Sequence, residues 1–300
     1  MSKKIKEKKV EKEYRKKLIK KRKPNRSIAG DLFLYLFLLG MAWLMAVPLI
    51  YQINNALKPL DELFKYPPRM WALNPTLDNF SDLFVTMGKS WVSFLRYLFN
   101  TVFVTVVGTA GHLLIASMGA FVLAKYEFPG AQTFFKVVTV SMMFVWQVTQ
   151  IPNYLILNGL GLIDSYWAII IPAFASPTGF FLMKQFMEGL PSTLIEAAKI
   201  DGATEWRVFS KIVMPNVKPA IMTMIIFQVQ SLWNNPASMY IYSEEKKTLV
   251  FAMNQIQAGG IARTGQGAAV AVVLIIVPIV TFIISESQIL ETMASSGLKD

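Results

Sequence analysis

The chain of 300 residues contains no cysteine and a single histidine. Without cysteine it has no disulfide bonds, thiolate nucleophiles or cysteine-ligated metal sites, although this absence does not indicate a compartment. The phosphate-binding pattern G-x-x-x-x-G-K-[ST] is also missing, so the chain does not hold a nucleotide in that manner. We therefore expect neither a cofactor nor a metal, and any work done by ATP must come from another polypeptide.

Charged side chains are also missing from six long apolar stretches of a chain that is 54% hydrophobic. Each stretch reaches about 18 residues or more, the length that a helix needs to cross about 30 Å of hydrocarbon. Strands are not expected, because ten-residue alternating segments are missing and backbone groups in lipid must bond within each span. The sequence therefore predicts an all-α integral membrane protein with six transmembrane helices, at about residues 32–50, 97–124, 137–157, 165–183, 219–236 and 267–285.

Basic residues are concentrated at the amino terminus, where 14 of the 30 lie within the first 30 residues. Because lysine and arginine accumulate on the cytoplasmic side of a membrane, residues 1–30 are predicted to be a cytoplasmic tail. This tail either contacts anionic lipid headgroups or serves only as an orientation signal. The transmembrane domain, residues 31–300, follows with an external loop at 51–96, a cytoplasmic loop at 184–218 and both termini inside.

The cytoplasmic loop carries the signals of two short helices joined at a glycine, within the string "EAAKIDGATEWRVFSKIVMP" that starts at Glu196. Thr193 and Glu196 have the spacing of a capping box, in which a hydroxyl and a carboxylate bond the free backbone amides of a helix start. A first helix is expected from about Leu194 to Asp201. Gly202 then permits the left-handed conformation that closes a helix at little steric cost.

The second helix of this loop is expected to be capped by Thr204 and to end before Pro215, because a proline disfavours helical geometry in the residue ahead of it. Trp206 and Phe209 are three residues apart and share one face of this helix. The two helices present an apolar surface either to a partner or to the cytoplasmic end of the chain's own bundle. Composition alone leaves both interpretations open.

The loop resembles the EAA loop of membrane subunits of ATP-binding-cassette (ABC) importers, whose pattern is E-A-A, three residues, G, nine residues, I-x-L-P. Methionine replaces the leucine, and the other pattern positions are occupied by Glu196, Ala197, Ala198, Gly202, Ile212 and Pro215. In that family the loop is a coupling helix that sits in a cleft of the partner ATPase. The resemblance implies the same contact here, with Asp201 and Trp206 inside the contacting segment.

The resemblance extends over nearly the whole chain, and "YEFPGAQTFF", "IPNYLIL" and "GLIDSYWAIIIP" are similar to the maltose-type, carbohydrate-uptake branch. It implies a type I importer fold in the inner membrane of a prokaryote. The implied partners are a second related permease subunit, two ATPase subunits and an external solute-binding protein. The implied substrate is a sugar or oligosaccharide, with a non-sugar solute as the alternative. The external segment 51–96, rich in proline and aromatic residues, is predicted to form a short folded lid.

Polar side chains inside spans are costly and mark candidate pathways. Gln147, Gln150 and Asn153 follow at a spacing of three in the third span, which places them along one face beside Trp146. They either bind a sugar or hydrogen-bond neighbouring helices, and the second role is the simpler explanation.

A second polar group lies near the external end of the fifth span, in "FQVQSLWNNP". It mixes amides with an aromatic ring and therefore suits either hydroxyl recognition or anchoring at the membrane interface. The candidate residues are Gln228, Gln230, Trp233 and Asn234. His112, on a line with Gly108, Ala116 and Ala120, is expected to be a buried structural residue, because no acidic companion accompanies it in the spans.

Two other classes of membrane protein share long apolar spans with an importer subunit. A stand-alone secondary transporter is expected to show ionisable groups in its spans or a duplicated half. An intramembrane enzyme is expected to show a catalytic constellation such as paired aspartates. In the six apolar stretches His112 stands alone as such an ionisable group, and neither an internal repeat nor a catalytic constellation occurs. The chain is therefore predicted to be a transporter subunit without catalytic residues.

Overall fold

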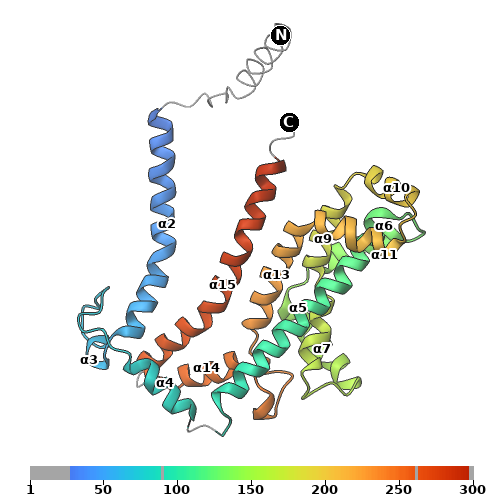
Figure 1. The fold of residues 1–300 in the computed structure, drawn as a ribbon. Coiled ribbons are helices and arrows are strands. Elements are labelled where there is room, and N and C mark those ends of the chain that lie inside the picture. Colours follow the sequence, from blue (N-terminus) through green and yellow to red (C-terminus); the bar gives the residue numbers. More distant parts are fainter. Residues whose placement is uncertain (1–27, 89–90, 261–262, 297–300) are drawn as a thin grey trace, which may run out of the picture. The chain divides into compact units, whose positions relative to one another are not determined.

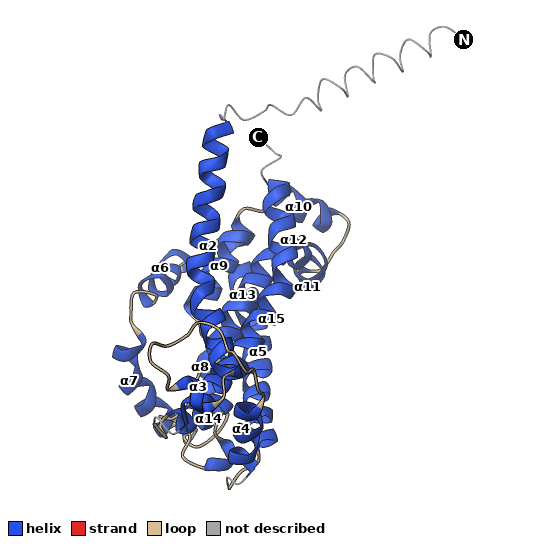
Figure 2. Ribbon diagram, turned by 90° about the vertical axis from the view of Figure 1, so that its left-hand side faces the viewer, coloured by secondary structure: helices blue, strands red, loops and turns tan. Residues whose placement is uncertain are grey.

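The computed structural model describes residues 28–88, 91–260 and 263–296, so most of the predicted basic tail lies outside the described residues. The described elements are all helical (Figures 1 and 2), in agreement with the predicted fold class. In chain order they are α2 (Ile28–Leu57), α3 (Leu60–Leu63), α4 (Asp78–Gly88), α5 (Phe94–Lys125), α6 (Ala131–Ser141), α7 (Trp146–Gly159), α8 (Trp167–Phe174), α9 (Pro177–Glu188), α10 (Ser192–Ile200), α11 (Glu205–Val208), the π-helix η1 (Phe209–Val213), α12 (Met214–Asn216), α13 (Lys218–Trp233), the 3₁₀ turn η2 (Glu244–Lys246), α14 (Leu249–Gln257) and α15 (Thr264–Ser296).

The chain divides into two compact units, Met1–Tyr51 and Gln52–Asp300. The described part of the first unit is the amino-terminal portion of α2, whose large apolar side chains are exposed, with Leu44 at 67%. Such a surface is unfavourable in water and is matched by lipid. The second unit contains the remaining helices and all of the candidate site residues.

Among the described residues, four helices are long and apolar enough to cross a membrane: Ala29–Leu57, Phe94–Lys125, Trp167–Glu188 and Thr264–Glu286. Two further pairs of helices pass the same test together but are sharply bent, which gives up to six spans when each pair counts as one. The helices also extend further than predicted, because α2 ends at Leu57 and α5 begins at Phe94. The external loop expected at 51–96 is therefore shorter at both ends.

The prediction of one continuous helix at 137–157 is wrong. Two helices, α6 and α7, occupy this region and are bent by 112° relative to each other. The extended backbone of Val145 ends the helical hydrogen bonding between them. The turn contains neither glycine nor proline, and the bend follows from packing: Phe135 of α6 stacks on Phe181 of α9 at 5.7 Å between ring centroids, whereas Trp146 of α7 packs edge-on against Tyr240 at 6.3 Å.

Helix α5 is the central helix of the second unit and packs against α8, α9 and α13 (Figure 1). Its small residues permit close approach, since a side chain at Gly108 would meet Leu232 of α13. His112 is 1% exposed, and its Nδ1 lies 3.0 Å from the carbonyl oxygen of Phe174. The prediction of a buried structural histidine is confirmed.

The amino-terminal part of α5 is fixed by polar contacts to the segment between α13 and α14 and to the start of α14. The Asn100 side chain donates from Nδ2 to the carbonyl oxygens of Glu245 at 2.8 Å and Lys247 at 2.9 Å. The Leu249 amide donates to Thr101 Oγ1 at 2.7 Å. Because these groups are shielded from water, their mutual hydrogen bonds hold the helix end firmly to that segment.

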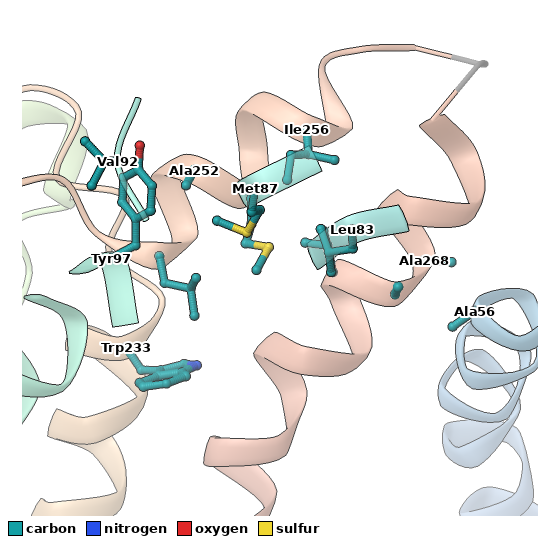
Figure 3. Packing of buried hydrophobic residues seen from close by; sticks show 13 residues of the cluster. Ala56, Leu83, Met87, Val92, Tyr97, Trp233, Ala252, Ile256 and Ala268 are labelled. Atoms are coloured by element: carbon teal, nitrogen blue, oxygen red, sulfur yellow. The ribbon is translucent and has the colours of Figure 1, made fainter. Parts of the chain in front are cut away.

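The predicted external lid is folded around an apolar cluster and buried polar groups. Leu83 and Met87 of α4 lie in one core cluster with Trp233 and residues of α14 and α15 (Figure 3). The Glu62 carboxylate accepts hydrogen bonds from the backbone amides of Leu73 at 2.9 Å and Asn74 at 3.0 Å. The Leu73 bond lowers the pKa of the Glu62 carboxyl and, with the Asn74 bonds, outweighs burial, which raises it.

Candidate functional site

The segment between α9 and α13 forms two short helices joined by a glycine, as the sequence predicts. Gly202 has φ +76, and the next amide, that of Ala203, donates to the Ala198 carbonyl at 2.9 Å. This is the left-handed closure of a helix that glycine adopts without a steric penalty. Thr204 then caps α11, with its Oγ1 accepting from the Arg207 amide at 3.3 Å.

The start of α10 differs from the predicted capping box. The helix begins at Ser192, two residues earlier than the box requires, so Thr193 lies within the first turn. Pro191 precedes the helix with φ −59 and ψ 131 and without a side-chain cap. Its ring fixes the extended geometry from which a helix can begin, and this replaces the hydroxyl cap as the start signal.

The end of the second helix also differs, because helical structure continues through Pro215 to Asn216. The π-helical turn η1 precedes the proline and shifts the pattern of backbone hydrogen bonds there. Asn216 Nδ2 donates to the Ile212 carbonyl at 2.7 Å. This side-chain bond reinforces the helix around the proline, which itself lacks a backbone donor. The predicted stop before Pro215 is therefore wrong.

The inner face of this segment is packed into the bundle. Phe209 is 6% exposed and lies 5.5 Å from the ring of Phe121 of α5. Ala198 is buried in the same core cluster, together with Met183 of α9 and Met224 of α13. The buried members from the loop itself are Ile195, Ala198, Val208, Phe209, Val213 and Val217. This half of the segment behaves as part of the bundle.

Polar contacts reinforce the attachment of the loop to α5. Tyr126, directly after α5, donates its hydroxyl hydrogen bond to Glu205. Glu205 also accepts an ion pair from Lys199 of α10 at 2.7 Å. Lys125, the last residue of α5, donates from Nζ to the Leu190 carbonyl at 2.5 Å. One cluster of side chains therefore ties both short helices to the end of α5.

The outer face of the segment is exposed. Ala197 is exposed although its neighbour Ala198 is buried, so the two alanines of the motif lie on different faces of α10. Glu196, Asp201 and Gly202 are exposed as well. Trp206 is 62% exposed and contacts Phe209 at 5.5 Å, which confirms that they share a face. Of the other motif residues, Ile212 is half-buried and Pro215 is exposed.

Two exposed apolar residues of α10 were not singled out from the sequence. Ile200 is 86% exposed at the end of the helix, and Leu194 is 45% exposed near its start. With Ala197 between them, they recur every three residues, which is a signal that places residues near one helical surface. An isoleucine left almost fully in water at a helix end is a candidate contact residue.

Two of the fifth-span candidates form contacts between helices. Gln228 is 6% exposed, and its Nε2 donates to the Ala173 carbonyl at 3.0 Å. Trp233 is 3% exposed, and its Nε1 donates to the Leu274 carbonyl of α15 at 3.0 Å. Asn234 bonds within its own chain segment, to the Gln230 carbonyl at 2.9 Å. Gln230 and Asn234 are both exposed.

A cavity of about 350 Å³ joins parts of the two predicted polar groups. It is lined by Trp146 and Gln150 of α7 and by Ser231 of α13, with Tyr240 on the following loop. The Tyr240 hydroxyl is buried without a hydrogen-bond partner among the described residues. The predicted candidates Gln147 and Asn153 do not line this cavity.

A clasp beside this cavity holds the loop after α13. Asp164 has φ +59 and accepts hydrogen bonds from the Tyr242 amide at 3.1 Å and from the Ser243 amide at 2.9 Å. Lys246 forms an ion pair with the same carboxylate at 3.0 Å. Burial raises the pKa of the Asp164 carboxyl, but the bonds from Ser243, Lys246 and Tyr242 outweigh it and hold the pKa well below its ordinary value.

Replacing Asp164 with asparagine is expected to lower the free energy of unfolding by about 1–2 kcal/mol at pH 7, because charge-assisted hydrogen bonds are lost. Asparagine tolerates positive φ, so the backbone is not strained. Since the pKa of the Asp164 carboxyl is lower in the folded than in the unfolded state, its contribution to the free energy of unfolding is fully present above the unfolded-state pKa. This contribution is lost as pH falls below about 4. The difference in free energy of unfolding between the parent protein and the Asp164→Asn variant should therefore decrease at acidic pH.

The measurement is thermal unfolding of the purified protein in detergent between pH 3 and pH 8. Asp61→Asn is the matched control, since the Asp61 side chain is 71% exposed and its ion pair with Lys65 is 3.9 Å long. The control should change stability by less than about 0.5 kcal/mol. Equal effects of the two substitutions at pH 7 would refute a clasp.

Among the residues that the structure describes, groups of three or more His, Asp or Glu side chains placed to hold a metal ion do not occur. An exposed helix joined to a membrane bundle and a small polar cavity are features of a transporter component.

Comparison with known proteins agrees with this conclusion. Residues 69–292 match the family described as "Binding-protein-dependent transport system inner membrane component". Protein LplC of Bacillus subtilis is 34% identical over 223 residues, which cover 74% of this chain and 73% of that protein. The polygalacturonan/rhamnogalacturonan transport system permease protein YtcP of the same organism is 32% identical over 231 residues, covering 75% and 77% respectively.

A further relative is the arabinooligosaccharides transport system permease protein AraQ of Halalkalibacterium halodurans, 33% identical over 65% of this chain and 69% of that protein. The fold is similar to a chain of a bacterial ABC transporter involved in the import of the acidic polysaccharide alginate. That likeness has a TM-score of 0.73 at 24% identity and covers 88% of this chain and 99% of the other. The chain therefore belongs to the inner-membrane components of binding-protein-dependent ABC transport systems, as a multi-pass transporter subunit rather than an enzyme.

Proposed function

We propose that this permease subunit imports a sugar or oligosaccharide across the cytoplasmic membrane of a prokaryote. It pairs with a second, related permease subunit and with two ATPase subunits, and it receives its substrate from an external solute-binding protein. The basic tail and both termini lie inside the cell, residues 31–300 form the permease domain, and the segment around α10 and α11 faces the cytoplasm.

The observation that carries the coupling part of this proposal is the two-sided structure of α10. Its inner face is buried in the bundle through Ile195 and Ala198. Its outer face leaves Glu196, Ala197 and Ile200 exposed. A helix that only completed its own bundle would not need an exposed isoleucine at its end, because that surface is unfavourable in water. Docking in an ATPase cleft removes it from water.

The substrate class is supported by the named relatives, whose descriptions include arabinooligosaccharide and polygalacturonan/rhamnogalacturonan transport. Within this chain, the cavity of about 350 Å³ offers an indole ring at Trp146, an amide at Gln150 and a hydroxyl at Ser231. Aromatic faces and hydrogen-bonding groups suit the apolar faces and hydroxyls of a sugar. A sugar hydroxyl in this cavity also offers a partner to the buried Tyr240 hydroxyl.

The roles of the remaining candidates follow from their contacts. Gln228 and Trp233 act through helix packing, since both donate to backbone carbonyls of other helices. Gln147, Asn153, Gln230 and Asn234 are assigned to the walls of the wider pathway, outside the 350 Å³ cavity. Of the residues predicted from the sequence, Trp146 and Gln150 are therefore the strongest substrate contacts.

The test is reconstitution of the full importer in liposomes with its binding protein and labelled oligosaccharides. Uptake is expected only with ATP inside and binding protein outside, and at least tenfold above the background of liposomes with ADP. Gln150→Ala should lower uptake more than Asn153→Ala, although both replace an amide of the same helix. Uptake by this chain alone without ATP would instead indicate a secondary transporter, and ATP-driven uptake of only non-sugar solutes would overturn the sugar assignment.

A further inference from the structure

Two large cavities lie between α5, α6 and α9, and they share walls. One has a volume of about 790 Å³ and the other about 750 Å³. Leu123, Phe128 and Gly130 line both of them. Helix α6 lies beside α9, where Phe134 contacts Phe180 edge-on at 6.2 Å between ring centroids. The two cavities are therefore neighbouring parts of one groove along the same three helices.

The first cavity is polar and lies at the ends of α5 and α9 that face the coupling loop. Its charged lining consists of Lys125, Glu127, Lys184 and Glu188. Lys184 pairs with Glu188 at 2.6 Å and lies 4.1 Å from the centre of the Phe135 ring. Lys125 uses one of its three donors on the Leu190 carbonyl. Two ammonium groups and two carboxylates thus line one cavity and balance in charge.

The second cavity is apolar and extends along the same helices toward their middle. On α5 its lining begins at Ile115, ten residues before Lys125, and on α9 it includes Phe180, one turn before Lys184. Val138 of α6 and Phe174 of α8 complete an aliphatic and aromatic wall. Since α5 rises about 1.5 Å per residue, the far end of this wall at Ile115 lies about 15 Å from Lys125 along the helix.

We propose that this groove binds one phospholipid with an amine-bearing zwitterionic headgroup, phosphatidylethanolamine. The phosphate lies at Lys125 and Lys184, the ammonium at Glu127 and Glu188, and one acyl chain fills the apolar cavity. An amphiphile matches both parts, whereas a soluble solute would leave the apolar cavity unfilled. Equal numbers of cations and carboxylates favour a neutral headgroup over an anionic one. Only the assignment of this lipid to the cytoplasmic leaflet rests on the membrane topology of the proposed function.

The test is native mass spectrometry of the purified importer complex in nanodiscs that contain equal amounts of phosphatidylethanolamine, phosphatidylcholine and phosphatidylglycerol. The expected result is one retained phosphatidylethanolamine for each copy of this chain. Val138→Trp fills the apolar cavity and should lower retention at least tenfold. Val137→Trp is the matched control, because Val137 is the preceding residue of α6, is 63% exposed and does not line the groove.

The headgroup assignment has its own variants. Glu127→Gln should reduce the preference for phosphatidylethanolamine over phosphatidylcholine, because the carboxylate that distinguishes a primary ammonium is lost. Equal retention in the two tryptophan variants would overturn the site, and a preference for phosphatidylglycerol would overturn the headgroup. Photocrosslinks from position 138 to the second permease subunit rather than to lipid would show that a protein helix fills the groove. The melting temperature of every variant separates a loss of lipid binding from misfolding. ATPase capture by every variant separates it from a failure of the proposed coupling.

Discussion

Replacing Ile200 with glutamate should reduce capture of the ATPase by the purified permease at least a hundredfold while leaving the permease folded. The side chain is 86% exposed, so the bundle does not depend on it. Burial of an isoleucine at an interface contributes about 1.5–3 kcal/mol. A glutamate in its place would also have to be buried without a partner, which costs several kcal/mol more. The sum exceeds the roughly 2.7 kcal/mol that a hundredfold change requires.

The measurement is the molar ratio of ATPase to permease after affinity purification, together with ATP hydrolysis in the reconstituted complex. Leu77→Glu is the matched control, because Leu77 is 68% exposed just before α4, far along the chain from α10, and receives the same charge. This control should retain full ATPase capture. An Ile200→Glu complex with normal stoichiometry and activity would be incompatible with docking through α10. A melting temperature within about 2 °C of the parent is required of both variants.

Replacing Gly179 with alanine should destabilise the bundle by about 1–3 kcal/mol, the usual cost of an extra methyl group in a filled core. The added Cβ would lie 2.2 Å from His112 Nε2. His112 cannot move easily, since it is 1% exposed and its other ring nitrogen bonds the Phe174 carbonyl. The two helices that carry these residues, α5 and α9, would have to separate.

Gly159→Ala is the matched control for this prediction, because it is also a helical glycine and nothing lies within 4 Å of its added Cβ. Alanine has the higher helix propensity, so the control should be neutral or slightly stabilising. Thermal unfolding in detergent gives both values. The double variant Gly179→Ala with His112→Ala should recover part of the loss, and a fully additive result would argue against this contact.

The sequence predicted those features that depend on local chemistry. Long apolar runs marked the spans, and Gly202 and Thr204 marked the joint between the two loop helices because a left-handed residue and a hydroxyl cap act over a few bonds. The start at Ser192 was missed for the opposite reason, since two local signals, Pro191 and Thr193, competed and the proline prevailed. Pattern alone does not rank such signals.

The features that were not predicted depend on contacts between distant residues. The bend between α6 and α7 follows from Phe135 and Trp146 packing on different partners. Asp164 meets Ser243 from 79 positions away, and no periodicity relates them. Likewise, a periodic pattern does not reveal whether Gln228 bonds a substrate or a carbonyl of another helix. Tertiary packing determines these contacts. The sequence therefore left two interpretations of the amides in the spans, substrate binding and hydrogen bonding between helices.

Helix α5 has a mechanical consequence that follows from its two fixed ends. It contains 32 residues and no proline, so it is a continuous strut of about 48 Å at 1.5 Å per residue. Tyr126 ties one end to Glu205 of α11, whereas Asn100 ties the other to the segment before α14 and Thr101 ties it to the first residue of α14. In the proposed topology, a movement of α10 and α11 is therefore transmitted along α5 to the segment before α14, because no proline interrupts the helix between them.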